Sequence, residues 1–475
     1  MKLRSGLLLA SAAILFGVNT FAMTVWQDSL RLATIKRANR KVLLVQLNDL
    51  AGSAKSDALA TLALPITEKY SVEPMLTHPL KNFSVLEQRS LGRYVYMIFN
   101  HSLSATDAAM VLQYMSSLPA VTQAFFEPTV SDPIAYPIIV PKSQLRTAPK
   151  VSGPAPNFEE KQQYLQPAPV GVDAQYAWTL PGGHGEGVNV IDIETGWYQE
   201  HNDFRKTFFE NGKNARRDHG TAVWGIIASK NDGVGTTGIA DKVEYGTCGT
   251  GYAGGGTDEY IRLLTRATVD AADHARPGDV VVMEQHMAGP DQGNYSPVEY
   301  FPPVFEVLKA ITDRGVFCVA AAGNGNSNLD SAEYAGAFDE TVRDSGCILV
   351  GAGGSPVGNS PRHRMYFSNY GKRVDAFGPG ELVTSTGYGD LFGNGDTTSN
   401  YTAQFNGTSS ATPVVSGVVA VLSGMAKAKN VIITPIQMRA AIRATGTPQD
   451  GGKTENIGSL PDLKVLTAKL FESVK

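Results

Sequence analysis

Three short apolar segments in the second part of the chain most constrain its fold. Residues 187–196 (GVNVIDIETG), 279–283 (DVVVM) and 315–322 (GVFCVAAA) have the length and composition of buried strands. Segments with helical periodicity alternate with them from about Tyr164 onward. This order predicts an α/β fold, a doubly wound parallel sheet with helices on both faces, over residues 164–475. A domain of about 300 residues buries about three quarters of its unfolded surface, so it needs no disulfide bonds.

The cysteines and the net charge argue against several classes of protein. Cys248, Cys318 and Cys347 are too few for a disulfide framework. Cys318 and Cys347 lie in apolar, strand-like runs, which favours buried free thiols, with a single bridge as the alternative. A formal net charge of −4 over 475 residues gives no basis for binding nucleic acid or an anionic membrane. The spacing of the histidines suggests no metal site.

The first 22 residues have the pattern of a secretory signal peptide. Met1 to Arg4 is basic, Leu7 to Val18 is apolar but too short to span a bilayer, and small residues precede an expected cleavage near Ala22. We therefore expect a protein that is secreted or delivered to the periplasm, without a stable membrane anchor. An uncleaved N-terminal anchor is the alternative, although no stop-transfer pattern follows.

Residues 23–130 are predicted to form a separate, small α+β domain. Strand-like runs at 41–47 and 93–99 precede a helix that begins with an S-x-x-D capping pattern at Ser104. The helix is expected to end at Leu118, and a strand follows over 121–126. Residues 131–163 are rich in proline and lack periodicity, which predicts an exposed linker. The small domain is also compatible with a ferredoxin-like interaction domain.

A stretch of small residues near the C-terminus, FNGTSSATPVVSG over 405–417, places Ser409 at the start of an apolar helix. At that place unpaired backbone N–H groups and the positive end of the helix dipole would stabilise an oxyanion beside the serine. The alternative is that Ser409 merely caps the helix. The choice depends on which other side chains accompany the serine.

Two other segments carry such side chains. His219 opens an amphipathic helix, where the helix dipole favours the neutral imidazole that a general base needs. Asn324 follows a predicted strand at its carboxyl end, and its amide can donate to an oxyanion. Asp192 and Glu194 lie two residues apart in one strand and therefore on one face. Taken singly, each residue could instead cap, pack or form a turn.

The order acid, histidine, asparagine, serine resembles that of the subtilisin-like serine proteases, the subtilase or S8 family. Four stretches carry the resemblance: HGTAVWGIIAS around His219, AAAGN ending at Asn324, YFSNYGKRVDAFGPG over 366–380, and NGTSSATPVVSG around Ser409. The resemblance implies a nucleophilic Ser409, a general base in His219 and an oxyanion donor in Asn324.

The acid departs from the family pattern, which has an aspartate just before a small residue and a glycine. Counting back seven residues from His201, or forward from Gly187, places Glu194 at that position. We interpret Glu194 as the acid that orients His219, and Asp192 as a buried acid beside it. With a two-residue bulge in the strand, Asp192 would be the triad acid instead.

The resemblance also implies partners and substrate contacts. Residues 23–130 would be an inhibitory pro-domain ending in the run Phe126-Glu127-Pro128, released by a cut in or just after the linker. Peptide substrates would lie in extended form along strand edges over 284–289 and 320–323. A glutamate at the pocket rim would favour basic substrate side chains. The implied substrate-binding residues are Glu284, which is that glutamate, Gln285, Gly289, Ala322 and Gly323.

Three functions are compatible with these patterns. The leading hypothesis is a secreted serine endopeptidase, made as an autoprocessed precursor, that hydrolyses peptide bonds through an acyl-enzyme on Ser409. A catalytically degenerate protease fold that acts as a binding protein is the alternative, favoured by the altered acid motif. A peptide ligase, which passes the acyl group to an amine, is the third. No cofactor is expected. Structural calcium is common in the family, although no EF-hand-like carboxylate spacing is present.

Overall fold

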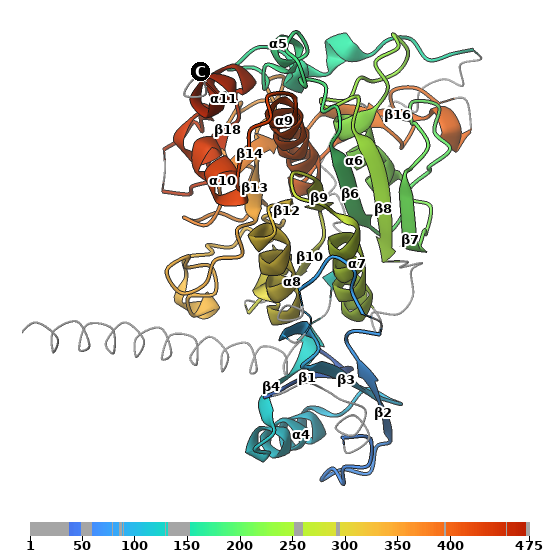
Figure 1. Ribbon diagram of the computed structural model, residues 1–475, viewed down its shortest axis with the longest axis vertical. Coiled ribbons are helices and arrows are strands. Elements are labelled where there is room, and N and C mark those ends of the chain that lie inside the picture. The colour runs from blue at the N-terminus through green and yellow to red at the C-terminus, as the bar shows by residue number, and fades with distance from the viewer. Residues whose placement is uncertain are drawn as a thin grey trace, which may run out of the picture.

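The computed structural model describes residues 38–48, 59–77, 79–84, 88, 90–128, 130–131, 153–250, 260–290, 295–393, 396–452 and 454–471. These residues form a small N-terminal domain and a larger C-terminal domain (Figure 1). The predicted signal peptide over 1–22 and residues 132–152 of the predicted linker lie outside the described residues.

The small domain is an antiparallel sheet with one helix on it. The strands β1 (Ala38–Leu47), β2 (Tyr70–Pro74), β3 (Tyr94–Phe99) and β4 (Val121–Pro128) lie in the order β2-β3-β1-β4. Helix α4 (Ala105–Ser117) contacts β4 and ends before Leu118, as predicted. Its N-cap is Ser104, whose hydroxyl accepts a hydrogen bond from the backbone N–H of Asp107 at 3.0 Å. Strand β2 had not been predicted.

The strands of the small domain bury both of their faces. Leu43 and Val45 belong to the core under α4, whereas Leu44 and Phe125 belong to the core of the large domain. This alternation follows from the two-residue period of a strand. The ring of Phe125 lies edge-on against that of Phe301, with centroids 5.5 Å apart. Figure 1 shows the sheet against the ends of α7 and α8.

The large domain is built on a nine-stranded sheet in the order β17-β18-β14-β13-β12-β9-β6-β8-β7. All neighbouring strands run parallel except β17 and β18. The strands are β6 (Asn189–Glu194), β7 (Phe209–Lys213), β8 (Glu244–Thr250), β9 (Val280–Met283), β12 (Phe317–Ala321), β13 (Ile348–Gly353), β14 (Ala376–Pro379), β17 (Thr447–Pro448) and β18 (Ser459–Leu460). β7 and β8, which follow β6 in the chain, lie on one side of β6, and the strands of this sheet from β9 onward lie on its other side. The topological switch point therefore lies between β6 and β9. Ligands of such sheets bind at the carboxyl ends of the strands at this point.

Helices cover this sheet, as predicted for a doubly wound fold. Helix α6 (Asp218–Ala228) packs against α9 (Thr408–Ala428), and α9 contacts β9, β12, β13 and β14. Helices α7 (Tyr260–His274) and α8 (Pro302–Asp313) pack against each other, α7 against β6 and β8 and α8 against β12. Helix α9 is long and apolar enough to cross a membrane, but it is entirely buried in the domain. It is therefore the core helix of this domain.

The C-terminal region contains α10 (Pro435–Ala444) and α11 (Leu463–Phe471). Helix α10 begins with a capping box between Thr434 and Gln437. All three cysteines are buried free thiols, which confirms the favoured prediction for Cys318 and Cys347.

The large domain begins before its predicted start at Tyr164. Asn157 forms a parallel bridge with Gly235. Gln162 is fully buried, and its side-chain amide donates to the carbonyl oxygen of Thr237 at 2.8 Å. Ala155, Phe158 and Gln162 are buried, so this part of the predicted linker is packed on the large domain.

Candidate active site

The site is built at the switch point of the sheet, where β6 ends in a carboxylate. Glu194 is the last residue of β6 and is completely buried. Its Oε1 lies 2.6 Å from Nδ1 of His219, the second residue of α6. The side chain of His219 retains 14% exposure, so its ring lies between the buried acid and the surface. The structure thus brings Glu194 to the histidine.

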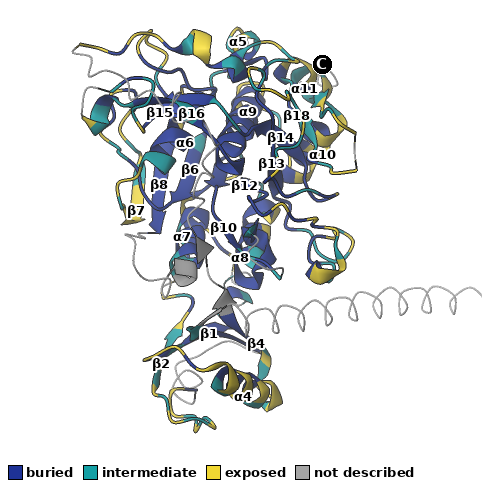
Figure 2. Cartoon of the chain, turned by 180° about the vertical axis from the view of Figure 1, so that it is seen from behind, coloured by how far each residue is buried: buried dark blue, intermediate teal, exposed yellow. Residues whose placement is uncertain are grey.

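Asp192 lies two residues earlier on the same face of β6 and faces other partners. Its Oδ2 accepts hydrogen bonds from Nε1 of Trp197 at 2.7 Å and from the hydroxyl of Tyr245 at 3.0 Å. Burial, and then the nearby charge of Glu194, raise the pKa of Asp192 above its ordinary value, while the hydrogen bonds from Trp197 and Tyr245 lower it. The two-residue bulge that would have exchanged the two acids is absent, because β6 pairs with β8 in unbroken register from Asn189 to Glu194. Figure 2 shows β6 and β8 as buried strands.

Ser409 lies in the first turn of α9, which packs against α6. The N-cap of α9 is Gly407, so the hydroxyl of Ser409 is not the cap of this helix. The hydroxyl of Ser409 is buried and makes no hydrogen bond within the described part of the chain. The interpretation of Ser409 as a cap is therefore wrong. The ring of Phe405 lies edge-on against the ring of His219, with centroids 5.5 Å apart, and so connects the two helix starts.

Asn324 is oriented by the residue next to the serine. Its Oδ1 accepts hydrogen bonds from both the backbone N–H and the hydroxyl of Thr408, each at 2.9 Å. The Nδ2 group of the same amide is buried and has no acceptor among the described residues. An unused buried donor normally costs free energy, so this amide is preorganised for an acceptor that arrives later.

Gly407 is required for this arrangement. Its φ of 92° lies in the left-handed region, and a Cβ at this position would lie 3.2 Å from Nδ2 of Asn324. A side chain here would strain the turn before Ser409 and crowd the amide donor. The glycine of the stretch over 405–417 thus has a structural reason.

Asn369, which carried no predicted role, fixes the loop that holds Asn324. Its Nδ2 donates to the carbonyl oxygens of Tyr295 and Ala322, and its Oδ1 accepts from the backbone N–H groups of Gly325 and Ser327. Three of these four groups belong to residues within three positions of Asn324 in the chain. The signal in the sequence was the stretch over 366–380, which carried the family resemblance without an assigned function.

The predicted substrate contacts at Ala322 and Gly323 are not available to a substrate strand. The backbone N–H of Ala322 donates to Val350 at 2.8 Å, and its carbonyl oxygen accepts from Asn369. The carbonyl oxygen of Gly323 accepts from the backbone N–H of Asn369. The segment over 320–323 continues β12, which lies between β9 and β13, so a substrate cannot pair with it as an added strand. Other contacts of Ala322 and Gly323 with a substrate stay a prediction.

The prediction that Glu284 lies at a pocket rim is also wrong. Glu284 follows β9 and has no exposed surface. Gln285 is likewise fully buried, and Gly289 is packed so closely that a Cβ would lie 2.2 Å from the hydroxyl oxygen of Ser296. Contact of these three residues with a substrate stays a prediction.

The short strand between Gln285 and Gly289 has an edge with which an extended peptide could pair. β10 (His286–Ala288) pairs on one side with β11 (Tyr295–Pro297). On its other side it pairs with β5 (Val130–Ser131), the short strand that follows the small domain in the chain. This edge of β10 is therefore occupied by the chain's own extended backbone.

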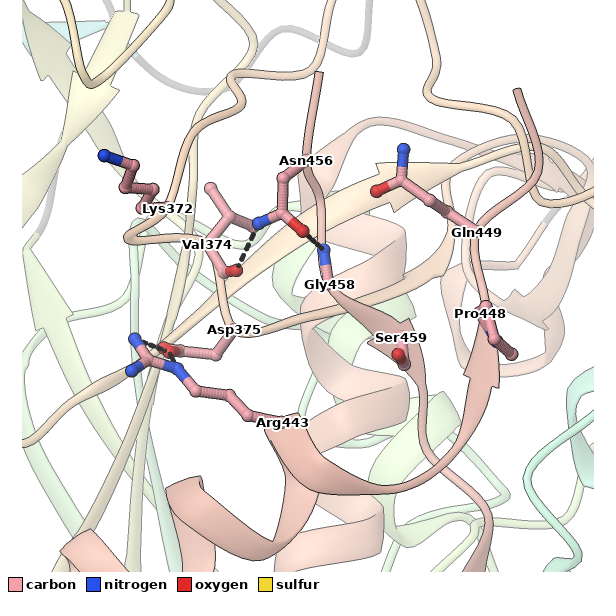
Figure 3. Close-up of a pocket in the computed structure, with 9 residues that line it drawn as sticks. All are labelled: Lys372, Val374, Asp375, Arg443, Pro448, Gln449, Asn456, Gly458 and Ser459. Atoms are coloured by element: carbon pink, nitrogen blue, oxygen red, sulfur yellow. Dashed lines mark hydrogen bonds and ion pairs between the residues drawn. The ribbon is translucent and has the colours of Figure 1, made fainter. Parts of the chain in front are cut away.

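A separate pocket of about 230 Å³ lies beside β14 and β18 (Figure 3). Arg443 in its wall is already paired with Asp375 and Glu340. The residues that line this pocket include none of the predicted site residues; they are Lys372, Val374, Asp375, Arg443, Pro448, Gln449, Asn456, Gly458 and Ser459. Among the residues that the structure describes, no group of three or more His, Cys, Asp or Glu side chains could hold a metal ion.

Comparisons with known proteins agree with this geometry. Residues 154–459 match the model of the subtilase family. Subtilisin Savinase of Lederbergia lenta is 29% identical over 282 residues, which cover 58% of this chain and 88% of that protein. M-protease of Shouchella clausii (strain KSM-K16) is 29% identical over 270 residues, and the match spans only 60% of its length.

Among solved structures, fervidolysin from Fervidobacterium pennivorans, described as a keratinolytic enzyme related to subtilisin, has the same fold. The alignment has a TM-score of 0.55 at 19% identity and covers 90% of this chain and 61% of that one. The similarity thus extends over the small domain as well as the large one.

Proposed function

The chain belongs to the subtilase family, the S8 family of serine peptidases, and on this basis we propose that it is a secreted serine endopeptidase made as an autoprocessed precursor. The observation that carries the proposal concerns two buried groups together. Within the described residues the hydroxyl of Ser409 makes no hydrogen bond, and the Nδ2 group of Asn324 has no acceptor. Neither feature has a use in stabilising the fold. Both are needed for acyl transfer.

In the proposed reaction the hydroxyl of Ser409 attacks the carbonyl carbon of a peptide bond. His219 accepts the proton of the hydroxyl and later donates it to the leaving amine. The developing oxyanion is bound by Nδ2 of Asn324 and by the backbone N–H of the serine at the start of α9. Water then hydrolyses the acyl-enzyme by the same steps in reverse.

Glu194 takes the part of the triad acid in this proposal. The carboxylate lies 2.6 Å from Nδ1 of His219 and therefore favours the tautomer that carries its proton on Nδ1 and leaves Nε2 as the acceptor. Its negative charge also stabilises the imidazolium that forms when Nε2 accepts a proton. A glutamate can do this as well as an aspartate, since the task requires a buried carboxylate at the right distance. Nothing in the proposed chemistry consumes or moves the acid.

We further propose that the small domain inhibits the large one until it is removed. Two contacts support this: the pairing of β5 with the edge of β10, and the cluster around Glu306 on α8. The hydroxyl of Tyr94 donates to Glu306 at 2.6 Å, and the hydroxyl of Ser90 donates to it at 3.2 Å. A peptide substrate would compete with β5 for the same strand edge. Release then requires a cut after residue 131, and the pattern over 1–22 directs the precursor out of the cytoplasm.

The proposal is tested with purified full-length protein and its Ser409→Ala variant. The unchanged protein is expected to hydrolyse casein, to separate its two domains, and to be labelled on Ser409 by a fluorophosphonate probe. The variant is expected to remain a single uncut chain without activity. A protein that binds peptides but neither cleaves them nor reacts with the probe would instead be a degenerate protease fold. Transfer of the acyl group to an added amine, seen by product mass, would identify a ligase.

A further inference from the structure

The parallel pairing of β6 with β9 brings a third carboxyl group to the site. Asp192 is paired with Val282, and Ile193 with Met283, so Glu284 is the residue directly after β9. Residues that are partners in a parallel pair point to the same face of the sheet, and so do residues two apart on one strand. Asp192, Glu194 and Glu284 therefore share one face, and none of the three has any exposed surface.

These three carboxyl groups differ in the hydrogen-bond donors that reach them. Glu194 has the ring of His219 and the backbone N–H of Thr195. Asp192 has the indole of Trp197 and the hydroxyl of Tyr245, both on Oδ2. No side-chain donor among the described residues is hydrogen-bonded to Oδ1 of Asp192 or to either oxygen of Glu284.

Glu284 and Asp192 are both fully buried on this face, and the charge of Asp192 raises the pKa of Glu284. Two buried carboxylates with no cation between them repel each other, so one of the two groups is expected to be a carboxylic acid. Asp192 receives hydrogen bonds from Trp197 and Tyr245, which favour its ionised form, whereas no other side chain that the structure describes donates to Glu284. The proton therefore belongs on Glu284, which donates it to the unoccupied Oδ1 of Asp192. Burial also raises the pKa of Glu284 well above its usual value, and the charges of Asp192 and Glu194 raise it further.

We propose that Glu284 is a positioning residue of the peptidase reaction: as a neutral carboxylic acid it donates a hydrogen bond to Asp192 and leaves Glu194 as the carboxylate that His219 meets. This inference rests on the proposed function, because it assigns a role in the same reaction. The charged and titratable groups that face the pair are Glu194 on β6, Tyr245 on β8 and His219 on α6. Within the described ranges these acids have no cationic partner besides His219. Each additional negative charge in the cluster would therefore raise the pKa of His219.

The arrangement predicts an alkaline limit to activity. Loss of the proton from Glu284 would place a new negative charge beside Glu194 in a buried environment. That charge would hold His219 protonated to higher pH and would repel the developing oxyanion, so kcat should fall. Glu284→Gln cannot lose such a proton, because its amide stays neutral, while its N–H group can still donate to Asp192.

The first experiment measures the protonation state directly by infrared spectroscopy, using the inactive Ser409→Ala precursor as background. The difference spectrum between this protein and its Ser409→Ala, Glu284→Gln variant at neutral pH should show the carbonyl band of one protonated carboxyl group, lost in the double variant. Absence of that band overturns the inference. A matched control, Ser409→Ala with Asp192→Asn, should keep the band, since the amide oxygen introduced at position 192 can still accept the proton of Glu284.

The second experiment compares rates per active site, counted by fluorophosphonate labelling. Glu284→Leu removes the donor and should lower kcat about tenfold or more, because a buried acceptor loses its partner. Glu284→Gln should restore most of that loss and shift the alkaline limb of the kcat profile to higher pH. An alkaline limb that is identical in Glu284→Gln and the unchanged protein overturns the inference. If the unchanged protein neither cleaves peptides nor reacts with the probe, the proposed function fails, while the infrared result still decides the state of Glu284.

Discussion

Replacing Glu194 by glutamine would keep the size of the side chain and remove its charge. Oε1 of Glu194 lies 2.6 Å from Nδ1 of His219, and the carboxylate has no exposed surface. At an effective dielectric constant of about 20, a charge pair at this distance is worth about 6 kcal/mol. Since each 1.36 kcal/mol corresponds to a factor of ten in rate, we expect kcat to fall by about 10⁴-fold. A glutamine that holds the wrong tautomer of the ring would give a loss of the same size.

Two further variants make this prediction quantitative. Glu194→Asp withdraws the carboxylate by one C–C bond, about 1.5 Å, so the contact lengthens to about 4 Å and the same pair is worth about 4 kcal/mol. The difference of about 2 kcal/mol corresponds to a loss of about 30-fold. Asp192→Asn keeps an acceptor for Trp197 and Tyr245 and does not touch the histidine, so its loss should stay below about tenfold.

The assay is steady-state hydrolysis of one peptide substrate at neutral pH, with active sites counted by fluorophosphonate labelling and with all variants shown to be folded. We predict that kcat is highest for Asp192→Asn, lower for Glu194→Asp and lowest for Glu194→Gln. A 10⁴-fold loss in Asp192→Asn together with a mild effect of Glu194→Gln would refute the assignment of the acid. Equal losses in all three folded variants would also refute it, because the loss would then not depend on the distance between the carboxylate and His219.

Three other predictions follow from single contacts. Asn324→Ala should lower kcat by about 10²- to 10³-fold with little change in KM, because the amide donor is used only when the oxyanion forms; steady-state kinetics decides. Gly407→Ala should lower kcat and the melting temperature together, since φ is 92° and a Cβ would crowd Asn324; calorimetry measures the second effect. Burial raises the pKa of Glu306 above its ordinary 4.5, so the small domain should be held most tightly below that pH and more weakly as pH rises. Size-exclusion chromatography of nicked Ser409→Ala precursor should show this trend, and Glu306→Gln should reduce it.

The periodic elements could be predicted from the sequence because their burial repeats at fixed intervals. The segment over 279–283 became β9, and the pattern around Ser104 became the cap of α4. β2 could not be predicted in this way, since its five residues alternate between half-buried and exposed positions, which gives a weak signal. The start of the large domain was placed too late for a similar reason. Gln162 is buried by hydrogen bonds to distant residues, and its neighbours have no period.

Candidate site residues could be placed from the sequence where a side chain of suitable chemistry lies at the start of a helix or after the end of a strand. Ser409 and His219 lie at helix starts and Asn324 follows a strand, as predicted from the sequence. The position of Glu284 at a rim was wrong, and the backbone of Ala322 is already paired, because both depend on pairings between distant strands. Whether a strand has a free edge, and which carboxyl groups share a face, is decided by the order of strands in the sheet.

The strand geometry explains why the two acids of β6 cannot exchange roles. Residues two apart on a strand are separated by about 6.5 to 7 Å along its axis, so Asp192 would have to move by that distance to meet His219. Such a shift would break the register that β6 keeps with β8 and β9 and would remove Asp192 from Trp197 and Tyr245. Glu194 needs no shift, because it stands at the strand end, and its longer side chain reaches the first turn of α6. A glutamate at position 194 is therefore consistent with an undistorted β6. Asp192, two residues earlier on the strand, is then available to pair with Glu284.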